Sequence, residues 1–204
     1  MNQWWRNTGR TIWTAVRAML VFTALLGVVY PLVMTGIGQL AFPWQANGSR
    51  LHNDDGQVVG SALIGQSFLD AQGQPLPQYF QPRPSAAGDG YDAGASGGTN
   101  WGPEDPRLIQ AIEQRRAQIA QFNDVDPSAV PADALTASGS GLDPDISPAY
   151  AAIQVQRVAS ARQMPVQAVQ DLVTQYTRGA DLGALSQACV NVVELNLALD
   201  QWQG

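Results

Sequence analysis

The residues best equipped for chemistry lie in one short stretch, Asp133–Pro148, which is rich in hydroxyls, carboxylates and glycines. Within it, Asp143 and Asp145 stand just ahead of Ser147-Pro148, a pair typical of a helix N-cap followed by proline at the first helical position. Carboxylates near a helix start are stabilised by the helix dipole. The stretch therefore predicts a polar loop that leads into a helix.

Three uses fit the side chains of Ser138, Ser140, Asp143 and Asp145. Their oxygens could hold a hard cation, could satisfy arginines of this chain or of a partner, or could cap and turn the backbone. The spacing matches no EF-hand loop and no bidentate glutamate follows. Capping and turning is therefore favoured, an ion pair comes next, and we assign no metal ligands.

A second candidate is Ser96-Gly97-Gly98-Thr99-Asn100, inside the Pro-, Gly-, Ser- and Ala-rich residues 81–103. Successive backbone N–H groups of Ser-Gly-Gly could bind an anion as a nest, and a plain tight turn is the simpler account of the tripeptide. Tyr91 and Trp101 interrupt the small residues. We therefore expect an ordered loop held on a surface and not a flexible linker.

Composition excludes several classes of active site. The chain has no lysine, one cysteine and one histidine, His52. A P-loop lysine, a Schiff-base lysine, a Ser-Lys dyad and an intramolecular disulfide are thus excluded within this chain. A hydrolase using Ser138 or Ser140 would lack a credible base and a G-x-S-x-G elbow, so we assign no catalytic residue.

The element that must position these loops is an N-terminal apolar run. Ala18–Ile37 contains no charged side chain and, as a helix, would span about 30 Å, the thickness of the hydrocarbon core of a bilayer. Arg6, Arg10 and Arg17 precede it, and no acid occurs before Asp54. The positive-inside rule then predicts a cytoplasmic N-terminus and an exported remainder.

A cleaved signal peptide is the main alternative, but its apolar region would be shorter, and Leu40–Trp44 is a poor cleavage site. A lipoprotein is excluded because the sole cysteine is Cys189. We therefore divide the chain into a short cytoplasmic N-terminus (1–10), a transmembrane region (11–41) and an exported domain (42–204). Residues 41–204 carry eight arginines against seventeen acids, a balance of −9 that disfavours nucleic acid as a partner.

Within the apolar run, Thr23, Gly27, Pro31 and Thr35 recur every four residues. Small residues on one helix face let helices approach closely in lipid, so the spacing favours contact with other membrane helices. The alternative is a lone anchor that tolerates threonine and glycine and is kinked by Pro31.

The exported part is predicted to be α+β. A polar connection is expected over 45–57 and a β-like run over 58–64. Asp105-Pro106 should begin a helix to about Phe122, with Leu108, Ile112, Ile119 and Phe122 on one face. The remaining elements are helices over 148–162 and 165–176, a strand over 189–195 and a closing helix over 196–202. The apolar face expected for the 148–162 helix comprises Ala151, Ala152, Val155, Val158 and Ala159.

Taken together, the motifs resemble the C subunit of the Kdp-type potassium-transporting P-type ATPase, over almost the whole chain. Two departures are visible: Thr99 stands where the family usually has serine, and Cys189 where it usually has an arginine, so a role of that arginine in pairing an acid is open here. The matching segments are residues 83–86 (RPSA), 96–100 (SGGTN), 136–148 (TASGSGLDPDISP), 154–159 (QVQRVA) and 190–197 (VNVVELNL).

The resemblance implies a subunit of a bacterial inner-membrane complex. Its partners would be a channel-like potassium-binding subunit, an ATP-hydrolysing pump subunit and a small accessory membrane peptide. Such subunits are described as catalytic chaperones that raise the ATP affinity of the pump, and they carry an ATP-binding label. An exported domain without lysine argues against direct ATP binding, so no cofactor is assigned to this chain. The alternative is a nucleotide-binding regulator that uses Ser96–Asn100. We expect Asp143, Asp145 and Ser96–Asn100 to form contact surfaces.

Overall fold

A computed structural model describes residues 2–180, 183 and 185–202, with the backbone alone for residues 2–7. The chain divides into two compact units, Met1–Ser49 and Arg50–Gly204. The first unit is helical and the second mixes helices with small sheets, which confirms the predicted α+β class.

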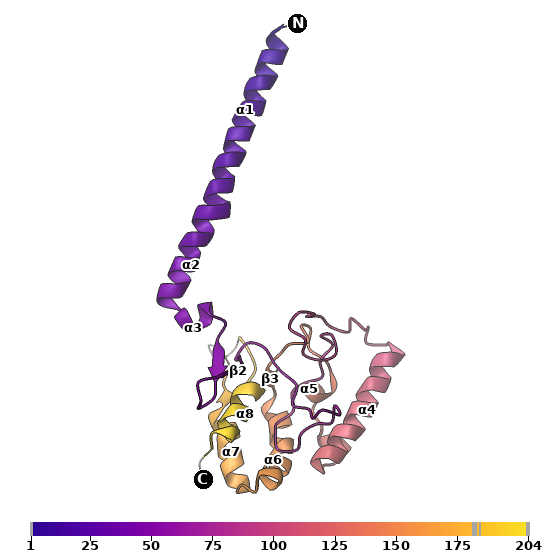
Figure 1. The fold of residues 1–204 in the computed structure, drawn as a ribbon. Coiled ribbons are helices and arrows are strands. Elements are labelled where there is room, and N and C mark those ends of the chain that lie inside the picture. Colours follow the sequence, from indigo (N-terminus) through magenta and orange to yellow (C-terminus); the bar gives the residue numbers. More distant parts are fainter. Residues whose placement is uncertain (1, 181–182, 184, 203–204) are drawn as a thin grey trace. The chain divides into compact units, whose positions relative to one another are not determined.

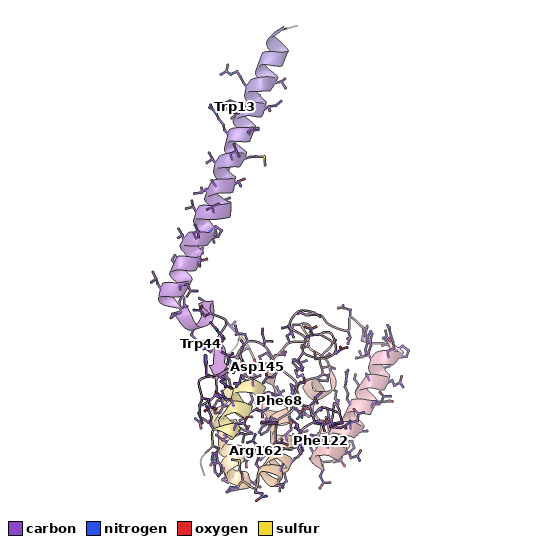
Figure 2. The ribbon with its side chains drawn as sticks, viewed as in Figure 1. Trp13, Trp44, Phe68, Phe122, Asp145 and Arg162 are labelled. Carbon is purple, nitrogen blue, oxygen red and sulfur yellow. The ribbon has the colours of Figure 1, made fainter. Side chains whose placement is uncertain are left out.

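The first unit is built on one long helical stretch. Helix α1 (Asn2–Ala24) continues through a π-helical turn, η1 (Leu25–Val29), into α2 (Tyr30–Ala41), and a short helix α3 (Pro43–Ala46) follows (Figure 1). The segment Thr8–Ala41 is long and apolar enough to cross a membrane. Trp13 and Trp44, labelled in Figure 2, are exposed on either side of the apolar run, as interfacial aromatic residues are.

The π-helical turn has a local cause. Pro31 has no N–H, so the carbonyl of Gly27, four residues earlier, cannot receive the usual helical hydrogen bond. Just before the proline, the N–H of Tyr30 donates to the carbonyl of Leu25, five residues back. The ladder thus widens by one residue over η1, which is how many α-helices accommodate an interruption.

The second unit buries its core between helices. Helix α7 (Val166–Gln175) packs against α6 (Pro148–Arg162) and α8 (Val192–Asp200), the orange-to-yellow group in Figure 1. Helix α4 (Pro106–Asn123) contacts α6 and the short helix α5 (Ala132–Leu135), which follows a 3-10 turn, η2 (Pro127–Ala129). The fully buried members of the core include Phe80, Ile146, Val158, Val169, Val190 and Leu195.

Two small antiparallel sheets complete this unit. Strand β1 (Arg50–His52) pairs with β2 (Val58–Ser61), with a register shift between Leu51 and His52. The other sheet has the order β3-β5-β4, in which β5 (Cys189–Asn191) lies between β3 (Asp145–Ile146) and β4 (Thr177–Arg178).

Three expectations need correction. The run expected as a strand over 189–195 is a strand only to Asn191, because the side chain of that residue accepts from the N–H groups of Val193 and Glu194, both at 3.1 Å, and starts α8. The connection expected over 45–57 contains the end of α3 and all of β1. On α6, Ala152 is exposed and Gln154 is buried in its place on the core side.

Between β2 and α4 the chain forms no helix or strand beyond isolated bridges, although Phe80 and Gln81 are buried. Buried backbone groups must still be paired. The Gln154 side chain accepts from the Gln81 N–H at 2.7 Å and donates to the Gln81 carbonyl at 3.1 Å. The Asn196 side chain does the same for Phe80, with both bonds at 2.9 Å. Two buried amides thus replace a neighbouring strand.

Two arginines of α6 extend this support. Arg157 donates to the Tyr79 carbonyl at 2.9 Å and to Asn123 Oδ1 at 2.9 Å, and its guanidinium lies 4.3 Å from the centroid of the Phe122 ring. Arg162, labelled in Figure 2, donates to the carbonyl of Gln78 at 2.6 Å. The irregular segment is therefore fixed by side chains and not by a sheet.

Replacing Gln154 with alanine should lower the free energy of unfolding by about 3 kcal/mol, because both backbone groups of Gln81 would be left buried without partners. Gln156, exposed on the same helix, is the matched control, and Gln156→Ala should change stability by less than about 0.5 kcal/mol. Urea unfolding of the full chain in detergent, followed by near-ultraviolet circular dichroism, measures both. Equal stability of the two variants would contradict the assigned role of the amide.

Candidate functional site

The two loops singled out in the sequence lie against each other. Residues 83–100 and 136–148 form what we term the loop junction. Ser96 Oγ and the Gly97 N–H both donate to the Ser140 carbonyl, each at 2.9 Å. Ser85 Oγ donates to the Gly141 carbonyl at 2.6 Å. Segments more than forty residues apart in the sequence are thereby held together by direct hydrogen bonds.

Close backbone approach requires glycine at the centre of the loop junction. Gly141 has φ +68°, and a Cβ there would lie 2.7 Å from the Gly97 carbonyl oxygen and 2.8 Å from the Ala87 nitrogen. Both the conformation and the space therefore exclude a side chain. Gly139, two residues earlier, has open space around its own Cβ position.

The serine hydroxyls of the loop junction turn the backbone. Ser138 Oγ accepts from the Gly141 N–H at 2.8 Å, and Ser140 Oγ accepts from the Leu142 N–H at 3.1 Å. Ser147 Oγ caps α6 by accepting from the Tyr150 N–H at 3.0 Å. The capping and turning use, favoured from the sequence, is what these hydroxyls do.

The carboxylates of this loop form ion pairs with arginines, which is the second of the three uses expected from the sequence. Asp143 Oδ2 pairs with Arg83 Nη1 at 2.9 Å, while its Oδ1 accepts from the Asp145 N–H at 3.0 Å. Asp145 Oδ1 pairs with Arg178 Nη2 at 2.7 Å. Capping and ion pairing therefore coexist in this loop. Among the described residues, no group of three or more His, Cys, Asp or Glu side chains is arranged to hold a metal ion.

Cys189 lies beside this carboxylate pair. On the central strand β5 it stands opposite Arg178 of β4, the residue whose guanidinium reaches Asp145. Asp145, on β3, thus obtains its arginine from β4, on the other side of the central strand β5. Burial, and secondly the negative charge of Asp145, raise the pKa of the Cys189 thiol. A thiol with a raised pKa is mostly protonated at neutral pH and is a weak nucleophile.

Residues 12–201 match the family model described as KdpC: K+-transporting ATPase, c chain. The chain belongs to the KdpC family. It is 53% identical to a potassium-transporting ATPase KdpC subunit of Beijerinckia indica, over 90% of this chain and 89% of the relative. It is 48% identical to the subunit of the same name from Mycobacterium tuberculosis, over 94% of this chain and 98% of the relative. It is 52% identical to the potassium-transporting ATPase KdpC subunit of Kineococcus radiotolerans, over 95% of this chain and 94% of the relative.

This assignment confirms the resemblance drawn from the motifs, and the structure gives each motif a physical role. In the motif at residues 83–86, Ser85 Oγ also accepts from the N–H groups of Ala87 and Tyr91, at 3.1 and 2.9 Å. The Tyr91 hydroxyl in turn donates to the Arg83 carbonyl at 2.7 Å. Sequence reasoning missed both roles. The position of Ser85 within the RPSA motif was the one available signal.

The candidate contact residues of this KdpC chain are placed unequally. Ser96 and Asn100 are exposed, and Asn100 takes a left-handed conformation at φ +53°. Gly97 and Gly98 are half-buried, and the Gly97 N–H is already bound to Ser140. Thr23, Gly27, Pro31 and Thr35 belong to the other unit and are exposed there.

Gly141→Ala should destabilise the globular unit by about 3 kcal/mol, because the residue would need both a strained backbone and space that two backbone atoms occupy. Gly139→Ala, with nothing near its Cβ, should remain within about 1 kcal/mol of the parent. Urea unfolding of the full chain would measure both, and limited proteolysis would show earlier cleavage within residues 83–100 of the Gly141 variant. Similar behaviour of the two variants would show that the loops are not held as described.

Proposed function

We propose that this KdpC chain is a single-pass accessory subunit whose N-terminus is cytoplasmic and whose globular unit lies on the extracytoplasmic face of the bacterial inner membrane. The observation that carries this is the distribution of charge along the chain. Arg6, Arg10 and Arg17 are the charged residues on the N-terminal side of the apolar run, while every acid follows it. An orientation with the arginines inside accords with the positive-inside rule.

ATP hydrolysis is assigned in this proposal to the P-type pump subunit, and the present chain is non-catalytic. Phosphate would find no lysine here, and the Gly97 N–H of the expected nest donates to Ser140 instead of standing free. Any increase in the ATP affinity of the pump would then be indirect, through assembly. Direct nucleotide contact at Ser96–Asn100 is the competing hypothesis, and it requires the globular unit to lie on the cytoplasmic side of the membrane, where ATP is.

Assembly would use two surfaces. One is the anchor face with Thr23, Gly27, Pro31 and Thr35, proposed to pack against the channel-like subunit. The other borders the loop junction, where a hollow of about 500 Å³ is lined by Leu63, Ile64, Ser138, Ser140 and Asp143, among others. Leu63 is 64% exposed and Ile64 40% exposed. Exposed apolar side chains surrounded by polar groups that are already hydrogen-bonded are typical of protein–protein interfaces.

The proposed effect of the acidic globular unit is to ease the entry of potassium into the ion pathway of the complex. With eight arginines against seventeen acids beyond residue 41, its surface would raise the local cation concentration near an ion pathway. Salt limits the reach of exposed charge to about 8–10 Å, so the effect requires that the unit lie at the mouth of that pathway.

In sealed inside-out membrane vesicles, residues 50–204 should resist added protease and become cleavable after detergent is added, because the unit would face the vesicle lumen. Immunoblotting of a C-terminal tag measures the protection, and a cytoplasmic domain of the pump subunit, cleaved in the intact vesicles, serves as the control. Cleavage of residues 50–204 in intact vesicles would overturn the orientation and favour the nucleotide reading.

Gly27→Leu should reduce copurification of the channel-like subunit several-fold, because a large side chain would separate closely packed helices. The Thr23→Leu/Gly27→Leu double variant should reduce it further. Ala18→Leu is the matched control, since at 100° per residue Ala18 lies on the opposite side of the helix and should be tolerated. The measurement is quantitative immunoblotting of the retained partners. Intact copurification of the double variant would refute the helix-face proposal.

A further inference from the structure

A cavity of about 320 Å³ lies beside α4. Its walls are mostly apolar and include Leu69, Ile119 and Phe122. Two arginines, Arg83 and Arg115, also line it, and among the described residues that form its walls there is no Asp or Glu. Arg83 is already paired with Asp143 at 2.9 Å, so the wall charge that lacks a counter-charge among these residues is that of Arg115.

Arg115 is the less compensated of these two cations. Within the part of the chain that the structure describes, its guanidinium donates to the Leu135 carbonyl at 2.9 Å, and no carboxylate pairs with it. Burial lowers the pKa of Arg115, which marks a guanidinium partly removed from water. A desolvated cation without a counter-charge is costly, and an anion close to it would offset that cost.

A second cation lies just behind the cavity wall. Arg157 donates to Asn123, which lines the cavity, and stacks on the lining residue Phe122. Burial lowers the pKa of Arg157 to about 10, so it remains charged at neutral pH. Its hydrogen-bond partners are neutral oxygens of Asn123, Gln154 and backbone carbonyls. Its charge therefore adds to the positive potential of the cavity.

The cavity is also lined by a tyrosine whose hydroxyl has no hydrogen-bond partner among the described residues. Tyr150 is 3% exposed and lines the cavity, and the structure gives its hydroxyl no hydrogen bond to any described residue. Buried tyrosine hydroxyls usually have a partner. By contrast, the other lining tyrosine, Tyr91, donates to the Arg83 carbonyl at 2.7 Å.

We propose that this cavity binds a small organic carboxylate with an apolar body, held by Arg115 and the Tyr150 hydroxyl and packed on Ile119 and Phe122. Its volume lies at the lower end of the usual range for ligand pockets, about 300–1,000 Å³, which suits a small occupant. The guanidinium offers charge-assisted hydrogen bonds to a carboxylate, and the apolar walls favour a hydrocarbon group over a hydrated inorganic anion. This cavity shares Arg83 with the loop-junction hollow, and its proposed ligand does not depend on the proposed orientation.

The test is isothermal titration calorimetry of the full chain in lipid nanodiscs, with empty nanodiscs as the blank. Phenylacetate is the probe, phenylacetamide is its uncharged counterpart, and inorganic phosphate is the anion without an apolar body. Phenylacetate should bind saturably with Kd below about 1 mM. Phenylacetamide, which lacks the charged carboxylate, and phosphate, which lacks the apolar body, should each bind at least about tenfold more weakly.

Arg115→Gln should weaken phenylacetate binding by at least about tenfold, and Tyr150→Phe by about three- to tenfold. Arg116→Gln is the matched control on the exposed side of α4 and should bind as the parent does. Tyr150→Phe removes a hydroxyl that makes no hydrogen bond to a described residue, so the stability of this variant should be unchanged. Equal affinity for phenylacetate and phenylacetamide, tighter binding of phosphate, absence of saturable binding, or equal losses in the Arg115 and Arg116 variants would each overturn the proposal.

Discussion

Two buried amide side chains decide how the globular unit is held together. Between β2 and α4 the chain passes through the core without regular structure, and its buried backbone needs hydrogen-bond partners. The Gln154 side chain bonds to both the N–H and the carbonyl of Gln81, and the Asn196 side chain bonds to both groups of Phe80. Since these amides come from α6 and α8, the position of the segment is set by helix packing. The residues that follow, from Arg83 onward, therefore leave the core at a fixed point, which is what allows them to meet the Thr136–Pro148 loop.

Sequence reasoning succeeded where the signal was local. The starts of α4 and α6 were predicted because Asp105-Pro106 and Ser147-Pro148 each combine an N-cap with a proline, and the structure shows both caps. Sequence reasoning failed where the position of a side chain depends on a partner that is distant in the sequence. Gln154 interrupts an apolar face and reads as solvent-exposed, yet Gln81, seventy-three residues earlier, draws it into the core. Strands of two or three residues, such as β3 and β4, are too short to show any period.

The site follows the same division. The hydroxyls of Ser138, Ser140 and Ser147 were recognised as capping groups, because each accepts from an N–H two or three residues further along the chain. Their ion pairs were left as one alternative among three, since Arg83 and Arg178 lie sixty and thirty-three residues away from Asp143 and Asp145. Contact between the two loops could not be predicted from residue types alone. It depends on the approach of Gly141 to Gly97 and Ala87, which only the folded chain brings about.

The anchor gives a further reason to read Thr23, Gly27, Pro31 and Thr35 as one face. In an uninterrupted α-helix a step of four residues turns about 40° beyond a full turn, so three steps would drift by roughly 120°. A π-helical turn holds more residues per turn, and η1 lies between the first and third members of the series, with Gly27 at its middle. The drift across these residues is therefore smaller than in a plain α-helix. Pro31, which interrupts the hydrogen-bond ladder, thus helps to align the small residues that a partner helix would contact.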